Sequence, residues 1–428
     1  MAVFGDLETY FDRLWPICRS ITGPGYRESL DILSELMPNE RLKFPSGKEV
    51  FDWNVPKEWL IRDAYIVGPD GKKYAEFKKN NLHILNYSSP FKGKMPLSDL
   101  QEHLHSLPDL PKAVPYMTTY YKERWGFCLS HEERQKLTEG LYEVMIDSEL
   151  KNGHLEIGEA VILGESNEEI LFTSYLCHPS MANNELSGPL VLSFLYREIL
   201  AMPKRHYTYR FAIVPETIGA LCYLSARGDH FIKNLLAGYV ITCVGIDSAF
   251  TYKRSRRGDS VGDLAAEQVL KDHGKPSQVI PFDPSAGSDE RQYCSPGFNL
   301  PVGSLMRAMY AQYPEYHTSL DNKSKISFDA MKETVQLYTD IVRVIESNKT
   351  WINKISYGEP QLGKRGLYPT LGSQKVTQRK VAQTLWVMNL ADGKNDLLSI
   401  ARISGQPMKE LIPIAEELAL KGLLVTNK

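Results

Sequence analysis

The sequence lacks the features that identify several common classes of protein. Its six cysteines are scattered and include no C-x-x-C pair, so a reduced, cytoplasmic setting is expected. No apolar stretch is long enough for a signal peptide or a membrane span, which predicts that the chain has no membrane partner. A phosphate-binding G-x-x-x-x-G-K-[ST] loop is also absent, which disfavours a nucleotide-binding enzyme of that class.

The charge balance excludes a strong attraction of the whole molecule to one kind of partner. The chain has 50 Lys and Arg residues against 52 Asp and Glu residues, which gives a formal net charge of -2. No global field therefore draws it to nucleic acid or to an anionic membrane. The hydrophobic content of 43% predicts a folded globular protein, and its 428 residues predict a main domain with one or two smaller ones.

Changes in residue pattern along the chain predict several parts. Apolar residues at helical spacing predict two helices within 6–37. Frequent prolines and short aromatic runs over 44–128, with the hairpin signal Pro69-Asp70-Gly71, predict a small β-rich domain. From about residue 153 to about residue 351, buried strands alternate with helices, which is typical of a mostly parallel sheet.

The last part of the chain has the pattern of a winged helix. Helices, a turn and a short strand follow one another within 386–425. The predicted recognition helix carries three acidic residues, which make a poor surface for phosphates: Glu410, Glu416 and Glu417. Protein contact or dimerisation into a homo-oligomer is therefore favoured over DNA binding. The basic segment 364–380 leaves DNA binding as an alternative.

Four polar residues follow predicted strands of the central sheet: His178, Glu216, Asp247 and His317. Because the carboxyl ends of parallel strands meet at one edge of a sheet, these side chains are expected to share a crevice. Two neutral imidazoles and a carboxylate suit an open, hydrolytic zinc site in which water takes the fourth position. Glu216 has the chemistry of a general base, which takes a proton from that water and returns it to a leaving amine.

Four motifs carry a resemblance to a known family: CHPSMANNELSG, PETIG, GSDERQYCSPGFNLP and PEYHTSLDN. In this order they resemble the co-catalytic zinc aminopeptidases, and more closely the bacterial aminopeptidase-like proteins with an inserted β domain and a C-terminal winged helix. The resemblance spans essentially the full length. It implies an α/β, phosphorylase/hydrolase-like (zinc exopeptidase) core with a mostly parallel sheet over 1–43 and 146–352. It also implies an inserted β-rich domain over 44–145, and a linker and winged helix over 353–428.

The resemblance also implies roles for single residues. His178 and Asp247 correspond to ligands of one zinc ion, His317 corresponds to a ligand of the second, and Glu216 corresponds to the general base. Asn184 stands at the position of the aspartate that bridges the two ions.

Two carboxylates of the family pattern are missing from this chain. Asn184 replaces the bridging Asp, and Thr217 replaces a second Glu, so both groups that would hold a second cation have no charge. Because two cations a few ångströms apart repel each other strongly, one zinc ion per chain is expected. Glu185, beside Asn184, offers an alternative carboxylate if the loop turns.

Further polar residues are expected near the mouth of the pocket and share a predicted role in substrate binding: Asp289, Glu290, Arg291, Arg254 and Arg256. An arginine there would hold a substrate carboxylate or a sugar acid through two parallel hydrogen bonds. Cys177 is expected to be a core thiol. Successive residues of a strand face opposite sides, which would separate it from His178.

These inferences favour a zinc-dependent, aminopeptidase-like hydrolase that acts on a small peptide or amide substrate. The resemblance also links such proteins to surface-polysaccharide synthesis, so a sugar-derived amide is an alternative substrate. Two other classes of function stay open as well. One is a binding or sensor protein that has lost turnover and signals through its winged helix, and the other is a DNA-binding regulator.

Overall fold

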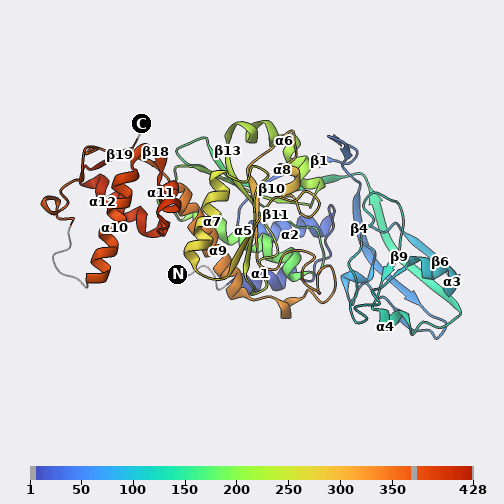
Figure 1. Cartoon of the computed structure of the whole chain (residues 1–428). Coiled ribbons are helices and arrows are strands. Elements are labelled where there is room, and N and C mark those ends of the chain that lie inside the picture. The colour runs from blue at the N-terminus through green and yellow to red at the C-terminus, as the bar shows by residue number, and fades with distance from the viewer. Residues whose placement is uncertain (1–5, 368–373, 427–428) are drawn as a thin grey trace.

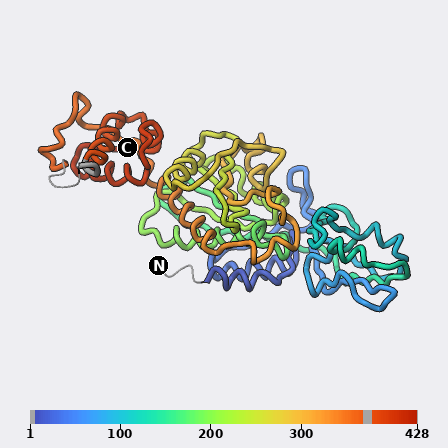
Figure 2. Tube along the Cα trace, turned by 60° about the horizontal axis from the view of Figure 1, so that its bottom comes forward, coloured from blue at the N-terminus to red at the C-terminus, as the bar shows by residue number. Residues whose placement is uncertain are grey.

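A computed structural model describes residues 6–367 and 374–426 of the chain. Figure 1 shows an α/β core in the middle, the inserted β-rich part at one end and the C-terminal helices at the other end. The rotated view in Figure 2 shows the same elongated order of the three parts.

The core is built on an eight-stranded sheet in the order β1-β10-β12-β11-β13-β16-β14-β15. The four central strands β12, β11, β13 and β16 are parallel, and both flanks contain antiparallel pairs. The strands have these bounds: β1 Glu40–Pro45, β10 His154–Ile162, β11 Glu169–Tyr175, β12 Thr208–Val214, β13 Leu235–Ile241, β14 Phe250–Lys253, β15 Ser277–Ile280 and β16 Val302–Met306. The predicted fold class, with its mostly parallel central sheet, is confirmed.

Helices cover both faces of this sheet, because alternate residues of the buried strands point to opposite sides. Phe172 belongs to the hydrophobic cluster of one face, and its neighbour Leu171 belongs to the cluster of the other. The first face is covered by α1 (Leu7–Leu14), α2 (Pro24–Ser34), α5 (Ser187–Leu200), α7 (Val261–His273) and α9 (Phe328–Ser347). The second face is covered by α6 (Ile218–Asn234) and the short α8 (Glu290–Tyr293).

The inserted part has its own four-stranded antiparallel sheet, in the order β5-β4-β9-β6. Its elements have these bounds: β2 Glu49–Val50, β3 Trp53–Asn54, β4 Glu58–Val67, β5 Lys73–Tyr74, β6 Phe91–Pro96, α3 Leu97–Leu100, β7 Leu104–His105, β8 Phe127–Cys128, α4 His131–Arg134 and β9 Leu141–Lys151. The Pro-Asp-Gly turn joins β4 to β5 as predicted, and Gly71 supplies the positive φ of 76°.

The C-terminal part has the order of elements typical of a winged helix. It contains β17 (Thr350–Asn353), α10 (Gln374–Leu390), β18 (Asp392–Asp396), α11 (Leu397–Ser404), α12 (Met408–Leu420) and β19 (Leu424–Thr426). The backbone N–H of Met408, at the start of α12, donates to Asp272 of core helix α7 over 2.7 Å. This helix is therefore attached directly to the core.

A serine in the pattern G-x-S-x-G lies at the start of α7, within residues 258–262. Its side chain caps the helix, since the hydroxyl of Ser260 donates to Asp263 at 2.6 Å and accepts from the Asp263 amide. The pattern therefore marks a capping box here and not a nucleophile elbow.

No helix within 6–367 or 374–426 combines the length and the apolar composition that crossing a bilayer requires.

A buried network of charges holds the antiparallel flank of the sheet to α6. Arg210 of β12 contacts Glu159 of β10 at 2.8 Å and Glu169 of β11 at 2.7 Å. Glu159 also accepts hydrogen bonds from Tyr223 and Arg227 of α6. Burial alone would raise the pKa of Glu159, but these donors outweigh it and lower that pKa below its ordinary value.

Removal of the charge of Glu159 is expected to destabilise the fold. Glu159→Gln leaves the buried guanidinium of Arg210 and the partly buried guanidinium of Arg227 undercompensated and should lower the free energy of unfolding by about 3 kcal/mol. Urea denaturation followed by circular dichroism measures this. Glu165→Gln is the matched control, because this side chain is 73% exposed. Equal stability of the two variants would contradict a role for the network.

Candidate functional site

A cavity of about 290 Å³ lies beside the carboxyl ends of β11 and β12. Its floor contains polar residues from three distant segments: Cys177, His178, Glu216, Thr217 and His317. Aromatic residues of the inserted part form much of its wall: Trp53, Tyr116, Tyr120 and Tyr121. A larger hollow of about 830 Å³ lies along α10, but no histidine or cysteine lines it. The chemistry of the side chains therefore identifies the smaller cavity as the candidate site.

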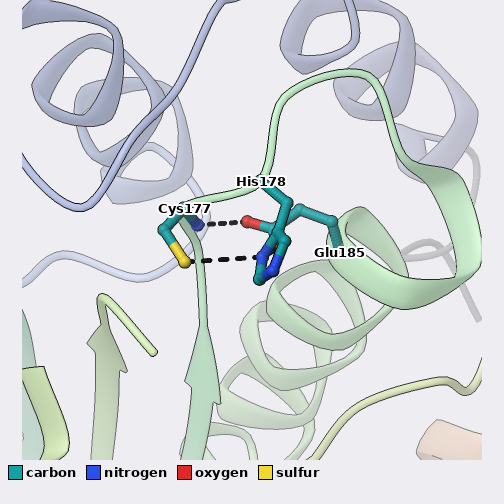
Figure 3. Close-up of side chains that lie close together, drawn as sticks. All are labelled: Cys177, His178 and Glu185. Carbon is teal, nitrogen blue, oxygen red and sulfur yellow. Dashed lines mark hydrogen bonds and ion pairs between the residues drawn. The ribbon is translucent and has the colours of Figure 1, made fainter. Parts of the chain in front are cut away.

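The orientation of His178 is fixed by Glu185. Glu185 belongs to a π-helical turn, Ala182–Leu186, which leads directly into α5. One of its carboxylate oxygens lies 2.7 Å from His178 Nδ1, and the other accepts the backbone N–H of Cys177. Figure 3 shows the three residues around this contact. Because Nδ1 is engaged, the other ring nitrogen, Nε2, is left for the cavity.

Arg19 places a buried positive charge near this group. Its side chain is fully buried, and its Nη1 donates to the carbonyl of Leu14 at 2.6 Å. Burial lowers the pKa of Arg19, while the nearby Glu185 and Cys177 act in the opposite direction. For His178, burial favours the neutral ring, but Cys177 and Glu185 outweigh it and raise the pKa of His178 above its ordinary value.

Cys177 lies closer to His178 than the alternation of a strand predicts. Its Sγ is 3.4 Å from His178 Nδ1. The expectation of opposite sides fails because β11 ends at Tyr175, so both residues lie outside the regular strand. Burial raises the pKa of the Cys177 thiol to about 11, and Nδ1 already has Glu185 as a partner. A thiolate nucleophile is therefore disfavoured, as expected for a core thiol.

Glu216 and His317 face His178 from two other segments. Glu216 Oε2 lies 3.6 Å from His178 Nε2, and the hydroxyl of Ser288 donates to Oε1 at 2.8 Å. The ring centroids of His178 and His317 are 5.2 Å apart. Burial, with the charge of the neighbouring His178, lowers the pKa of His317 to about 3. His317 is therefore a neutral imidazole at physiological pH, which is the form that binds metals.

The inserted part holds the backbone of His317 in place. His317 has a positive φ of 54°, which non-glycine residues adopt rarely. Its carbonyl accepts the N–H of Tyr116 at 2.8 Å, and the N–H of Ser319 donates to the carbonyl of Val114. The ring of Tyr116 also packs against both His178 and His317. The inserted part is therefore a structural component of the site.

Asp247 does not join these residues. Its side chain is 75% exposed and lies 3.2 Å from Arg307. Strand β13 ends at Ile241, six residues before Asp247, so the side chain that leaves the strand end beside the site is that of Thr242. This placement departs from the sequence-based expectation of a metal ligand at Asp247.

A cluster of neutral groups lies where the family resemblance places a bridging carboxylate. The hydroxyl of Tyr175 lies 2.6 Å from Thr242 Oγ1 and donates to Asn184 Oδ1 at 3.2 Å. The backbone N–H of Asn184 donates to Asp321. The side chains of Tyr175, Asn184 and Thr242 satisfy one another and carry no charge, and both carboxylate oxygens of the nearby Asp321 accept backbone N–H groups, those of Asn183 and Asn184.

The residues expected at the mouth have other partners. Asp289 and Glu290 are fully buried, Asp289 accepts the N–H of Thr217 at 2.7 Å, and Glu290 pairs with the buried Lys253 at 2.9 Å. Neither carboxylate is exposed to a ligand, which departs from the predicted role in substrate binding. Arg291 is partly buried and donates to the carbonyl of Ser288.

The two arginines predicted beside them lie outside the cavity lining. Arg254 pairs with Glu267 at 2.7 Å, and Arg256 donates to Asn299 at 3.0 Å. Strand β14 ends at Lys253, directly before these arginines, and pairs with β15 in parallel.

Two groups of side chains have the chemistry of a metal site. The ligand atoms of Cys177, His178 and Glu185 all lie within 4.8 Å of one another. Glu185, however, already accepts two hydrogen bonds and lies near Arg19, so a dication there would face a buried guanidinium. In the cavity, His178 Nε2 and the neutral ring of His317 could hold one zinc ion, because imidazole nitrogens are common zinc ligands, and the carboxylate of Glu216 lies beside them.

Comparison with known proteins identifies two matching family models. A model described as a domain of unknown function, DUF4910, matches residues 9–348, and a winged helix-turn-helix model matches residues 349–426. A relative from Clostridium acetobutylicum is described as a candidate polysaccharide biosynthesis protein with an aminopeptidase-like domain. It is 44% identical over 420 residues, which cover 98% of this chain and 96% of that protein.

Solved structures show the same fold. A crystal structure described as a candidate peptidase from Clostridium acetobutylicum has a TM-score of 0.93 and 42% identity, with 99% of this chain and 96% of that chain covered. A zinc aminopeptidase from Bacillus subtilis has a TM-score of 0.54 at 13% identity, with 79% of this chain and 93% of that chain covered. The second likeness shows the fold alone.

The buried, neutral state of His317 predicts a pH dependence of stability. His317 is neutral in the folded protein and binds a proton in the unfolded protein near the ordinary pKa of about 6.5. Stability is therefore expected to fall as the pH drops below that value, by about 2 kcal/mol at pH 5. Denaturation of chelator-treated protein at pH 7 and pH 5 should show a smaller loss for His317→Gln. An equal loss in the two proteins would contradict the assigned state.

Proposed function

We propose that this chain, which belongs to the aminopeptidase-like family described as DUF4910, is a metal-dependent hydrolase of amide bonds in a small substrate. The observation that carries the proposal is the convergence of His178, Glu216 and His317 on one cavity of about 290 Å³. These residues come from three segments far apart in the sequence. Convergence of two imidazoles and a carboxylate in an aromatic pocket is typical of a catalytic site.

One zinc ion would be held by His178 Nε2 and His317. When bound, it supplies Lewis-acid chemistry that polarises a carbonyl and acidifies water. Glu185 supports His178 by occupying Nδ1, as carboxylates do for metal-binding histidines. Asn184 and Thr242 offer only neutral oxygens, which favours one ion over two.

Glu216 is the residue proposed to move the proton. Its Oε1 is held by Ser288, and its Oε2 faces His178 at the cavity floor with 29% of the side chain exposed. This exposure lets a water reach the carboxylate. Glu216 takes a proton from the attacking water and delivers it to the departing amine. The surrounding tyrosines restrict the entry of further water.

The rim of the cavity favours a substrate with a flat apolar surface. Trp53 and Tyr121 lie edge to face with ring centroids 5.2 Å apart, and their side chains are 38% and 53% exposed. Such rings can pack against a sugar ring or an aromatic side chain. The description of the Clostridium relative names polysaccharide biosynthesis. We therefore propose sugar-derived amides, besides small peptides, as a class of substrate.

Ligand binding without turnover is the second candidate. It is favoured by Asn184 and Thr217, which are neutral residues at positions where the family pattern has carboxylates, and by the neutral partners of Asn184, which are Tyr175 and Thr242. Such a protein would keep the pocket and lose the reaction.

A substrate screen separates the two candidates. Zinc-supplemented wild type is tested against aminoacyl and N-acyl amides, with Glu216→Gln as the variant and Glu165→Gln as the exposed control. Loss of general-base catalysis should lower kcat by roughly 10²- to 10⁴-fold in Glu216→Gln, while the control keeps its rate. Elemental analysis should find about one zinc per chain in each protein.

The outcomes have distinct meanings. A wild type that binds these amides and turns none of them over supports the binding protein. Loss of zinc from Glu216→Gln would show that Glu216 is a metal ligand and would overturn its role as proton acceptor.

For the winged helix, the proposed role is protein contact. Its recognition helix α12 pairs with basic residues of α10, through Arg379 with Glu410 and Lys380 with Glu417. Its first turn is tied to the core at Asp272. These pairs neutralise Arg379 and Lys380, two cations that phosphates could otherwise contact.

Binding to DNA is therefore expected to be absent. Fluorescence anisotropy with a labelled 20-base-pair duplex should show no saturable change at low ionic strength. Paired replacement of Glu410 and Glu417 by Gln frees Arg379 and Lys380 and serves as the comparison. Tight, salt-dependent binding by the wild type would contradict the proposal and support the DNA-binding regulator.

A further inference from the structure

The residue after Glu216 has a strained backbone. Thr217 has φ 62° and ψ -75°, and the N–H of Ile218 donates to the carbonyl of Glu216 at 2.8 Å. This is a γ-turn with a positive central φ, a rare conformation that is especially unfavourable for a β-branched residue. Such strain persists only where surrounding contacts enforce it.

Two adjacent residues of the loop before α8 provide those contacts. Asp289 Oδ1 accepts the N–H of Thr217 at 2.7 Å, and the hydroxyl of Ser288 donates to Glu216 Oε1 at 2.8 Å. The loop is itself fixed, since the N–H of Ser288 donates to Glu290 at 3.0 Å and Glu290 pairs with the buried Lys253. A rigid, buried segment thus holds both the backbone and the carboxylate of the turn.

The carboxylate of Asp289 does not cap the helix that it precedes. Asp289 is the N-cap residue of α8, but its side chain makes no capping hydrogen bond. Its Oδ2 is buried and has no hydrogen-bond partner among the described residues. A helix cap would direct the oxygen to the N–H groups of α8. Here the side chain is directed to Thr217, which lies 72 residues earlier in the chain.

We propose that Ser288 and Asp289 are positioning residues that hold the Glu216 carboxylate at the cavity floor by stabilising the strained turn at Thr217. This inference rests on the proposed function, in which Glu216 moves the proton. Without Asp289, Thr217 relaxes to a common conformation, and Glu216 leaves its place 3.6 Å from His178 Nε2. The pair thus controls the rate of proton transfer without contact with the substrate.

Kinetics of four variants test the inference. Asp289→Ala should lower kcat by roughly tenfold to a hundredfold, as loss of the hydrogen-bond acceptor of a backbone N–H implies, and leave KM nearly unchanged. Asp289→Asn keeps an acceptor for the Thr217 amide and should recover most of that kcat. Thr217→Gly removes the strain, because glycine adopts positive φ freely. The loss caused by Asp289→Ala should therefore be much smaller in the Thr217→Gly background.

Crystal structures of Asp289→Ala and Asp289→Asn supply a readout that needs no activity. Glu216 and Thr217 should move in the first variant and keep their conformation in the second. An unchanged turn in Asp289→Ala, or an equal kcat loss in both backgrounds, overturns the inference. If the wild type hydrolyses no amide, the proposed function fails, and the two crystal structures still decide the positioning role. Thermal melting identifies any variant that does not fold, and Asp289→Asn serves as the milder substitution.

Discussion

The carboxylate of Glu185 makes two contacts that set the geometry of the whole site. It accepts a hydrogen bond from the backbone N–H of Cys177 and contacts Nδ1 of His178. These contacts join the segment after β11 to the π-helical turn that precedes α5. Burying this carboxylate would be costly without compensation, and the fully buried Arg19 lies near enough to provide it. The direction of His178 Nε2, and with it the position where Glu216 and His317 can meet it, follows from this one contact.

The core alone does not complete the cavity. Glu216 and His317 come from loops of the α/β core, but the backbone of His317 is held by Tyr116, which also supplies a wall of the pocket. Thr217 and His317 both have strained conformations and both line the same cavity, and each is fixed by hydrogen bonds with a distant segment. Strain of this kind is typical of functional sites, because only a well-determined surrounding structure can maintain it.

The fold was predictable from the sequence because it depends on local periodicity. Continuous apolar runs predicted the buried strands, helical spacing predicted α1 and α2, and the Pro-Asp-Gly signal predicted the turn at Gly71. His178, Glu216 and His317 could be found because each follows a strand or belongs to a recognisable motif.

The rest of the site depends on where elements end and on burial, which one sequence does not reveal. Asp247 was selected because it is a carboxylate after a strand, but β13 ends six residues earlier, and the neutral Thr242 takes the inner position. Asp289 and Glu290 looked like mouth residues because charged side chains are usually exposed, yet both are buried with internal partners.

The inserted part enters and leaves the core through neighbouring strands. Glu58, at the start of β4, is paired with Lys151, at the end of β9, so the two connections are about one strand spacing apart, roughly 5 Å. A segment attached in this way can be exchanged for another without rearrangement of the central sheet, and in this sense it is a cassette. Because this cassette carries Tyr116, Tyr120 and Tyr121, its replacement would change what the pocket recognises while the acid-base groups stay on the scaffold. A replacement segment would, however, also have to supply the hydrogen bond that Tyr116 donates to the carbonyl of His317.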